Sequence, residues 1–506
     1  MVVQKFGGTS VADPDAIRRL IDIVRATRAR DDRGPVLVVS AMSRVTDALL
    51  AVAAEAGASR SESALAQVEQ LRERHLTSAR ALLGNAAGNA VGSAVGSAAG
   101  SAVGSAVGSA VGNAVGSAAS GAAGSTADDT LLAALISHID QQFDELAAVV
   151  KALAVLREVS VRTLDVVTAM GELLNSRIVA AALVHAGLPG EWVDARRAIV
   201  TDDDHTRANP LMRETTSALR TSVLLLVDAG RIPVLGGFVG ATVEGHTTTL
   251  GRGGSDYSGA IVGAGIGAAE IQIWTDVDGM LTADPRVIPE SRLVPRLSFA
   301  EAAELSYFGA KVLHPSTIQP AVERNIPVRI LNSRKPDGGG TLITADPVSG
   351  GDPLTAMAGK RNLTVVDITS TRMLMAYGFL RRVFEVFERF TTAVDVVTTS
   401  EVSVSVTVDD PRHLEAIVDA LSEFANVSTE PGMALLCAVG DRLRAEPAIA
   451  ARVIRVLEEV PLRMISQAAS RRNITVVLRE SDLPHAMRRL HEEFFAVIQP
   501  QEPAVA

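Results

Sequence analysis

The chain has a single cysteine, no excess of positive charge and no visible export signal at its N-terminus. The lone Cys437 excludes an intramolecular disulfide framework and fits a reducing compartment. A net charge of −10 gives no general attraction to nucleic acid or to an anionic membrane, so any phosphate site has to be built locally. Met1 leads directly into the strand-like run Val2 to Phe6, without the charged and apolar regions of a secretory signal. We therefore expect a cytoplasmic protein that binds neither nucleic acid nor membrane.

The composition is that of a globular protein with substantial cores. Of the 506 residues, 47% are hydrophobic and 21% are charged, which indicates two or more domains. Apolar runs such as 191–194, 222–227 and 232–239 are predicted to be strands, and helical patterns separate them. This alternation predicts an α/β layer structure.

A glycine-rich loop follows one of these predicted strands. It reads Thr-Thr-Thr-Leu-Gly-Arg-Gly-Gly-Ser-Asp at 247–256 and precedes a predicted helix rich in Gly and Ala. Its glycines let the backbone approach a ligand closely, and Ser255 or Asp256 is expected to cap the helix, whose N–H groups favour an anion. Arg252 adds a planar cation. Taken alone, the loop could equally be a turn with a capping serine.

The N-terminus has a similar arrangement of a predicted strand, a glycine-containing turn and a predicted helix. The predicted strand Val2 to Phe6 runs into the turn Gly7-Gly8-Thr9-Ser10, and a helix is predicted to follow from a cap at Asp13. Lys5 is placed to lean over a hollow of phosphate size made by this turn. A lysine at a strand end is, taken alone, more often a solvated edge residue.

A low-complexity stretch separates two predicted helices, at 61–83 and 130–156. From Gly84 to Ala119 it repeats a four-residue unit, mostly Gly-Ser-Ala-Val, and these small residues cannot offset the entropy of ordering the chain. We expect a disordered insert. The Gly-xxx-Gly spacing also matches a packing motif of membrane helices, but a Ser or Asn in most units argues against a span.

Two further polar positions are candidates for ligand contacts. Glu172 is expected to open a helix after Gly171, where a carboxylate is often only a partner of the helix dipole. Thr275 and Asp276 follow the predicted strand 270–274, and open α/β sheets bind ligands at the carboxyl ends of their strands.

Several motifs in a fixed order resemble those of aspartate kinases. They are Lys-Phe-Gly-Gly-Thr-Ser at 5–10, the loop at 247–256, Trp-Thr-Asp-Val at 274–277 and Gly-Ala-Lys-Val-Leu-His-Pro at 309–315. The resemblance implies the amino-acid-kinase fold, an α/β sandwich with a mainly parallel central sheet, followed by two ACT domains of ferredoxin-like α+β type. No GxxxxGK[ST] sequence is present, so phosphoryl transfer would use a scaffold other than the P-loop. The implied domain limits are 1–345 for the catalytic domain, with a low-complexity insert at 84–125, a linker at 346–360, and ACT domains at 361–430 and 431–506.

The resemblance also implies a reaction and a set of roles. The β-carboxylate of aspartate is ionised at neutral pH and can attack the γ-phosphorus of Mg-ATP without a general base. The implied catalytic residues are Lys5 and Asp256. The implied aspartate-binding residues are Thr46, Glu172, Arg252 and Ser255, and the implied ATP-binding residues are Lys5, Gly7, Gly8, Gly253, Thr275, Asp276, Arg286 and Lys311. Leu281 departs from the tyrosine of many relatives, which puts one contact to adenine in doubt.

The C-terminal part is expected to bind an amino-acid effector and to form a homodimer. The implied effector-binding residues are Met373, Phe379, Leu380, Val394, Asp395, Ser400 and Glu401. Asp395 and Glu401 suit L-lysine, which carries two ammonium groups, whereas threonine would leave one carboxylate without a partner. Both acids could instead be solvated residues at strand ends. Alanines at 376 and 393, where relatives often have serine, indicate weaker binding or a different effector.

Three other functions are considered from the sequence. The chain length leaves no room for the homoserine dehydrogenase domain of bifunctional relatives. A kinase of glutamate or N-acetylglutamate would share the fold, but Glu172 and Arg252 favour a substrate with a free α-amino group. A non-catalytic amino-acid sensor is disfavoured because Lys5, Arg252 and Asp256 are all present.

Overall fold

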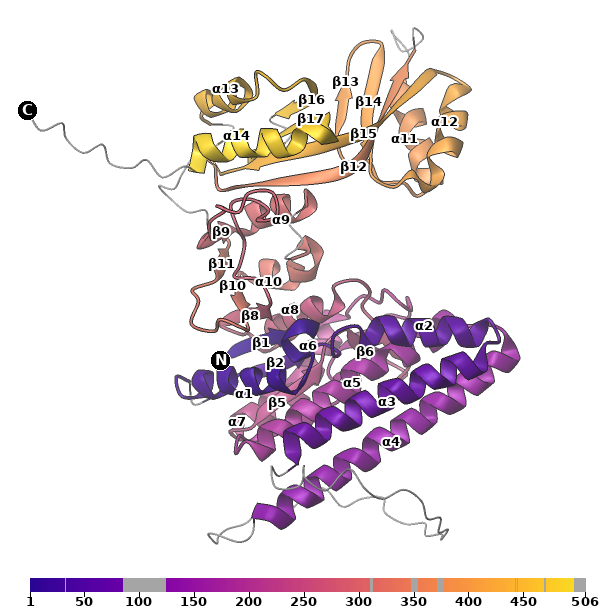
Figure 1. Ribbon diagram of the computed structural model, residues 1–506, viewed down its shortest axis with the longest axis vertical. Coiled ribbons are helices and arrows are strands. Elements are labelled where there is room, and N and C mark those ends of the chain that lie inside the picture. Colours follow the sequence, from indigo (N-terminus) through magenta and orange to yellow (C-terminus); the bar gives the residue numbers. More distant parts are fainter. Residues whose placement is uncertain are drawn as a thin grey trace, which may run out of the picture. The chain divides into compact units, whose positions relative to one another are not determined.

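The protein is described by a computed structural model that divides into two compact units, Met1–Asp276 and Val277–Ala506. The structure describes residues 1–31, 33–84, 124–309, 313–346, 354–370, 377–441, 443, 445–467 and 470–495. Figure 1 labels the helices and strands of both units. The unit boundary at residue 276 differs from the catalytic limit of 345 expected from the sequence.

A parallel sheet forms the centre of the first unit. Its strands lie in the order β3-β5-β2-β1-β8, and every pairing among them is parallel. The same unit contains a second, small sheet in the order β4-β6-β7, in which β4 and β6 are parallel and β6 and β7 are antiparallel. The mainly parallel α/β architecture predicted from the sequence is confirmed. The strands are β1 (Val2–Phe6), β2 (Val36–Val39), β3 (Gly190–Val193), β4 (Val200–Thr201), β5 (Ile232–Gly236), β6 (Val239–Thr242), β7 (Thr247–Thr249) and β8 (Glu270–Thr275).

The helices of the first unit pack on this sheet and on one another. Helix α5 contacts β3 and β5, α8 contacts β1 and β8, and α2 to α5 form a helical group (Figure 1). The expected cap of α1 is present, since the Asp13 side chain accepts the N–H of Ala16. The helices are α1 (Pro14–Arg28), α2 (Val45–Gly57), α3 (Ser61–Leu83), α4 (Gly124–Leu156), α5 (Val161–His185), α6 (Met212–Leu219), α7 (Leu225–Asp228) and α8 (Gly254–Ile266). Short turns of 3₁₀ or π type are η1 (Gly8–Val11), η2 (Ala195–Arg197) and η3 (Arg220–Leu224).

Helix α5 corrects one sequence prediction. It runs without a break from Val161 to His185, with Ser160 as its cap, so Glu172 lies in its interior rather than at its start. Gly171 does not end the helix. A Cβ at this position would lie too close to the side chains of Ala41 and Val45. The glycine therefore serves close packing. Helix α5 is long and apolar enough to cross a membrane, but 83% of that stretch is buried inside the structure, which is typical of a core helix.

The run 222–227 corrects another. Its apolar residues predicted a strand, but the chain is helical there, through η3 and α7. Val223 and Val227, four residues apart, are buried, whereas Leu225 between them is 62% exposed. That spacing belongs to one face of a helix. The low-complexity insert predicted at 84–125 falls almost wholly outside the described residues.

The second unit begins with a short set of strands and helices. Strand β10 pairs antiparallel with β11, which pairs parallel with β9. A capping box, Ser298 with Glu301, starts α9. The elements are β9 (Arg296–Ser298), α9 (Phe299–Tyr307), η4 (Pro315–Ile318), α10 (Gln319–Glu323), β10 (Val328–Asn332) and β11 (Thr341–Thr344).

A six-stranded sheet in the order β13-β14-β12-β15-β17-β16 follows, and all its described pairings are antiparallel. Its two long strands, β12 and β15, each have 14 residues and pair with each other through most of their length. The strands are β12 (Ala356–Thr369), β13 (Val397–Thr399), β14 (Ser403–Val408), β15 (Asn426–Val439), β16 (Leu462–Gln467) and β17 (Asn473–Arg479). The helices are α11 (Phe379–Arg389), α12 (Leu414–Ser422), α13 (Pro447–Val456) and α14 (Leu483–Phe495), with short turns η6 (Pro411–His413) and η7 (Glu480–Asp482).

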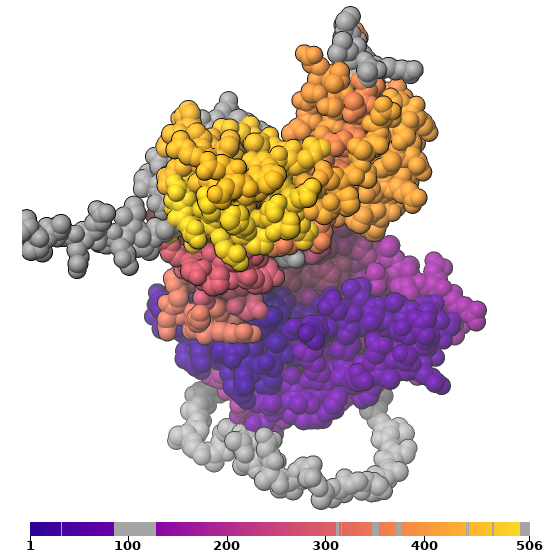
Figure 2. Space-filling model, turned by 45° about the horizontal axis from the view of Figure 1, so that its top comes forward, coloured from indigo at the N-terminus to yellow at the C-terminus, as the bar shows by residue number. Residues whose placement is uncertain are grey.

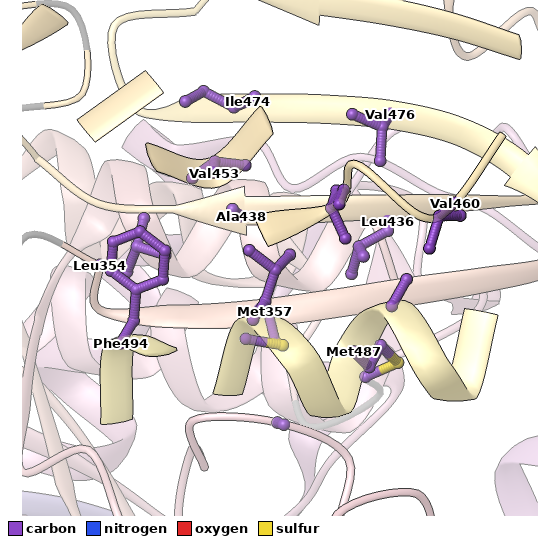
Figure 3. Close-up of a cluster of buried hydrophobic side chains, with 14 of the residues drawn as sticks. Leu354, Met357, Leu436, Ala438, Val453, Val460, Ile474, Val476, Met487 and Phe494 are labelled. Carbon is purple, nitrogen blue, oxygen red and sulfur yellow. The ribbon is translucent and has the colours of Figure 1, made fainter. Parts of the chain in front are cut away.

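This sheet carries two separate hydrophobic cores. The first lobe has its core between residues 366 and 421 and contains α11 and α12. The second lobe has its core at Leu354, Met357 and residues 434–495, with α13 and α14. Figure 2 shows the surfaces of the two lobes in orange and yellow, and Figure 3 shows Met357 among the side chains of the second core.

The predicted linker at 346–360 therefore extends too far, because its last five residues belong to a strand. Residues 356–360 are the first part of β12 and pair with β15, because Ala356, Met357 and Ala358 are buried in the second lobe. The second lobe thus takes one strand segment from before the first lobe and the rest from after it. Cys437 is buried in β15, and burial raises the pKa of its thiol to about 12, so it acts as a packing residue.

Candidate active site

Two adjoining hollows open in the first unit where β1, the glycine loop and α5 meet. The first has a volume of about 540 Å³, within the range of small-molecule sites. Its lining residues are Lys5, Ser40, Thr46, Asp47, Leu50, Leu164, Thr168, Glu172, Thr206, Phe238, Thr249, Gly251, Arg252, Gly253, Gly254, Ser255 and Asp256.

The second hollow has a volume of about 470 Å³ and shares several walls with the first, including Thr46, Glu172 and Ser255. It adds Gly7, Gly8, Thr9, Ala41, Met42, Ser43, Arg44, Thr275 and Asp276. The structure therefore brings together, within one unit, every residue predicted for aspartate binding and most of those predicted for ATP.

Lys5 and Asp256 form a buried ion pair at the base of the first hollow. The Lys5 ammonium comes from the central strand β1 and lies 2.5 Å from a carboxylate oxygen of Asp256 in the first turn of α8. Gly259 permits this approach, since a Cβ there would lie 3.1 Å from the Lys5 Cβ. Lys5 is only 7% exposed, so the solvated strand-end interpretation is wrong.

The glycine loop enters α8 through backbone geometry that only glycine adopts freely. Gly251 and Gly253 have φ of +73° and +75°, and Gly253 occupies the cap position of the helix. The predicted capping by Ser255 or Asp256 is wrong, because α8 already starts at Gly254 and both residues lie inside its first turn. Their side chains are thereby left to face the hollows.

Arg252 and Glu172 provide opposite charges on the first hollow. Arg252 is exposed and makes no ion pair with the described residues. Glu172 is 4% exposed, and its Oε2 atom has no hydrogen-bond partner. Burial raises the pKa of Glu172 to about 8, against the lowering effects of the Ala41 and Glu172 N–H groups and of the Lys5 charge.

The remaining predicted ATP contacts are less well assembled. Thr275, the last residue of β8, and Asp276, which follows it, line the second hollow. Arg286, in the second unit, makes a bidentate ion pair with Asp284 and is 81% exposed. Lys311 lies outside the described residues. Leu281 lines a separate cavity of about 320 Å³ in the second unit.

The predicted effector residues are scattered over the first lobe. Phe379 packs into its core, Leu380 is 40% exposed, and Val394 packs at the edge of the core. Ser400 and Glu401 are exposed in the turn between β13 and β14. Met373 lies outside the described residues.

Asp395 is already engaged within the chain. Its side chain is 3% exposed and accepts hydrogen bonds from the Lys360 ammonium at 2.7 Å and from the Tyr307 hydroxyl at 3.0 Å. Lys360 also pairs with Asp409 at 2.8 Å and lies over the Tyr307 ring. Asp395 is therefore not a solvated strand-end residue.

The sequence interpretation missed several residues that line the first hollow, among them Thr206 and Phe238. Thr206 and Phe238 both have positive φ, of +71° and +65°, and such strained backbone is frequent at functional sites. It also missed Asp165, which is fully buried and does not line the hollow itself. Its spacing of seven residues from Glu172 was a usable signal, since it puts both on one face of a helix, but only once α5 is known to be continuous.

Comparison with known proteins identifies the family. The amino acid kinase family matches residues 1–332, and an ACT domain matches residues 436–494. Aspartokinase 3, chloroplastic, of Arabidopsis thaliana is 34% identical over 97% of this chain and 81% of that protein. The chain belongs to the aspartokinases. Two solved structures support this membership, both of E. coli aspartokinase III at 30% identity over 98% of this chain and 100% of theirs: a complex with lysine and aspartate (T-state), with a TM-score of 0.76, and a complex with aspartate and ADP (R-state), with a TM-score of 0.74.

Membership agrees with the architecture described above. The amino acid kinase match contains every residue lining the two hollows. The ACT match falls on the second lobe alone, after the β12 segment that completes its core. Lys5, Glu172 and Arg252, which line the first hollow, therefore lie in the amino acid kinase part of the chain.

Proposed function

We propose that the protein transfers the γ-phosphoryl group of ATP to the β-carboxylate of L-aspartate, the first step towards lysine, threonine and methionine. The observation that carries this is the charge arrangement on the first hollow. It contains a buried Lys5–Asp256 pair, an exposed Arg252 and a buried Glu172 whose Oε2 atom lacks a partner. An α-amino acid supplies the missing cation for Glu172 and the missing anion for Arg252.

The residues act by positioning and by neutralising charge. Arg252 holds the α-carboxylate, and Glu172 accepts the α-ammonium, with Thr46 and Ser255 beside them. The β-carboxylate, ionised at neutral pH, then attacks phosphorus without a general base. Lys5 stabilises the charge on the transferring group, and Asp256 fixes the position of the Lys5 ammonium.

ATP is assigned to the second hollow. Gly7, Gly8 and Gly253 allow phosphates to approach the backbone, while Thr275 and Asp276 contact the nucleotide. The family resemblance also assigns Arg286 and Lys311 to nucleotide binding. Among the described residues, no three His, Cys, Asp or Glu side chains gather into a metal site. This suits Mg²⁺, which is usually bound through substrate phosphates and only one or two carboxylates. Bound Mg²⁺ would neutralise phosphate charge, and Asp276, one of the carboxylates that line the second hollow, would hold it.

Trapping the acyl phosphate with hydroxylamine tests the proposal. Aspartate, glutamate and N-acetylglutamate are compared at equal concentration, with ADP release followed in parallel. We expect turnover with aspartate and at least tenfold less with the other two, since the spacing and charges of a site decide such discrimination. Faster turnover of glutamate or N-acetylglutamate would show that the assigned substrate is wrong. No turnover with any of the three would indicate a non-catalytic sensor.

We also propose that L-lysine inhibits the enzyme by binding to the first lobe. Two carboxylates, the exposed Glu401 and the buried Asp395, can each receive one ammonium group of lysine. Because Asp395 is paired with Lys360, a ligand ammonium reaches it only by displacing that lysine. Met373, Phe379, Leu380, Val394 and Ser400 are assigned to the same site. Lysine then inhibits only to the extent that it binds an inactive arrangement better than the active one.

Initial rates measured against lysine, threonine and methionine test this regulation. We expect inhibition by lysine alone, and an inhibition constant raised about tenfold or more in Glu401→Ala, since one charged contact is lost. A wild-type enzyme insensitive to lysine would refute the assignment.

Finally, we propose a cytoplasmic homodimer that associates through the ACT lobes. The support is the resemblance to aspartate kinases, which implies a dimer formed through the sheets of the ACT domains. Light scattering behind a sizing column at several protein concentrations measures the oligomeric state. A monomer at micromolar concentration, with and without lysine, would contradict the proposal.

A further inference from the structure

Asp165 is a fully buried carboxylate to which the proposed mechanism gives no role. It lies in the first turns of α5, seven residues before Glu172, so the two acids project from one face of the helix. A buried charge is tolerated only where other groups satisfy it. The partners of Asp165 therefore identify what this residue holds in place.

Those partners come from two separate segments. The Thr206 N–H donates to both carboxylate oxygens, at 3.0 and 3.1 Å, and the His205 ring nitrogen Nδ1 lies 2.6 Å from Oδ2. The Thr249 hydroxyl, at the end of β7, donates to Oδ1 at 2.5 Å. Asp165 thus ties a loop around 202–209 and the strand leading into the glycine loop to the same point on α5.

The loop needs such a tie. Thr206 has φ of +71°, and a β-branched residue rarely takes this left-handed conformation without support. Its carbonyl oxygen would lie only 3.2 Å from a Cβ at Gly251, and the Ala208 N–H donates to the Thr249 carbonyl at 2.9 Å. The strained loop therefore lies directly against the backbone that carries Arg252.

We propose that Asp165 is a positioning residue for aspartate binding. By fixing the glycine loop to α5, it sets the separation between Arg252 and Glu172. This inference rests on the proposed function, in which those two residues hold the carboxylate and the ammonium of one α-carbon. Arg252 and Glu172 can bind one α-amino acid together only at a fixed separation. Loss of the Asp165 charge should therefore weaken aspartate binding and leave the nucleotide contacts of the second hollow in place.

Asp165→Asn tests the role, because it keeps the shape of the side chain and removes its charge. We expect the KM for aspartate to rise about tenfold to a hundredfold, as small displacements of binding groups do, while the KM for ATP changes less than about threefold. Aspartate should also lose most of its ability to raise the Tm of the protein without nucleotide. The matched control is Asp194→Asn, another Asp with a mostly buried side chain, 14% exposed, that pairs with Arg196 and is not among the residues lining either hollow. It should leave both KM values unchanged.

Thr249→Val removes one partner of Asp165 and conserves the branched shape, so it serves where Asp165→Asn does not fold. It should give the same selective rise in the KM for aspartate, by a smaller factor. A lower Tm with an unchanged KM for aspartate, or equal changes in both KM values, would overturn the inference and leave Asp165 a structural residue. A wild-type protein that does not bind aspartate would instead overturn the proposed function, and with it this extension.

Discussion

The two units each contain one lysine set among acidic side chains, and the two groups differ in how completely their charges are paired. In the first unit, Lys5 pairs with Asp256, while Glu172 keeps a buried oxygen without a partner. In the second unit, Lys360 pairs with both Asp395 and Asp409, and the Tyr307 hydroxyl adds a further bond to Asp395.

This difference in pairing means that a ligand ammonium would stabilise the group around Glu172, whereas the group around Lys360 is already neutralised within the chain. An unpartnered buried carboxylate is unfavourable in the empty protein, and a bound ammonium relieves this cost. Around Lys360, burial opposes its charge, but the bonds to Asp395 and Asp409 outweigh that effect and raise its pKa. A ligand there gains nothing until it breaks an existing ion pair.

Removing the lysine of the first group should have the largest effect. In Lys5→Met we expect kcat to fall at least about a hundredfold, on the order of 3 kcal/mol, because the lost cation acts mainly in the transition state. Hydroxylamine trapping and ADP release measure the rate, and circular dichroism checks the fold. Lys151→Met, at an exposed position of α4, is the control and should be fully active. A variant at position 5 with nearly normal turnover would remove Lys5 from the mechanism.

Replacing the unpartnered carboxylate should stabilise the empty protein at high pH. The pKa of Glu172 is about 8 in the folded state and near 4.5 when unfolded, so the folded state binds this proton more tightly. The stabilising contribution is complete below pH 4.5 and is lost as the pH rises through 8. Glu172→Gln should therefore gain on the order of 4 kcal/mol over the wild type at pH 9 and less than about 1 kcal/mol at pH 5.

Urea unfolding at the two pH values measures this difference. Glu191→Gln, at the exposed ion pair with Arg231, is the control and should change stability by less than about 0.5 kcal/mol. An equal difference between wild type and Glu172→Gln at pH 5 and pH 9 would contradict the assigned shift.

Breaking the paired group should have a smaller and opposite effect. Lys360→Met leaves Asp395 buried without its cation, which should destabilise the protein by about 1–2 kcal/mol, between the values for exposed and buried pairs. The kcat without effector should not change. Lys335→Met, at a more exposed pair with Asp278, is the control. Unchanged stability in Lys360→Met would show that the second group is not held by its ion pairs.

Shortening the low-complexity repeat should have the smallest effect. Replacing residues 84–119 by a short Gly/Ser linker should leave turnover and Tm nearly unchanged, because the repeat has too little apolar bulk for a core and loop-closure entropy varies slowly with length. Thermal melts and initial rates measure this. A loss of several degrees in Tm would give the repeat a structural role.

Features encoded locally could be predicted from the sequence. The cap at Asp13, the helix at 61–83, and the glycine loop with its neighbouring strand and helix all depend on residues close together in the chain. Most of the predicted site residues around the two hollows come from the resemblance of several motifs to those of aspartate kinases, and only Thr275 and Asp276 are also indicated by the end of a predicted strand.

Features decided by distant contacts could not. Gly171 reads as a helix breaker until its packing on Ala41 is known. Residues 356–360 read as a linker because their core partners follow much later, at 434–495. The partners of Asp165 and of Asp395 are likewise far away in sequence. The residues next to either acid therefore do not indicate whether its carboxylate is paired within the chain or free to bind a ligand.

The divided second lobe has a consequence for synthesis on the ribosome. Its first strand segment, up to residue 360, emerges before the entire first lobe, and the rest of its core follows only at 434–495. At ordinary elongation rates this segment waits on the order of ten seconds for its partners. During that time its apolar residues, Leu354 and Met357 among them, have no core to enter, so the nascent chain offers a hydrophobic segment to chaperones until translation is nearly finished.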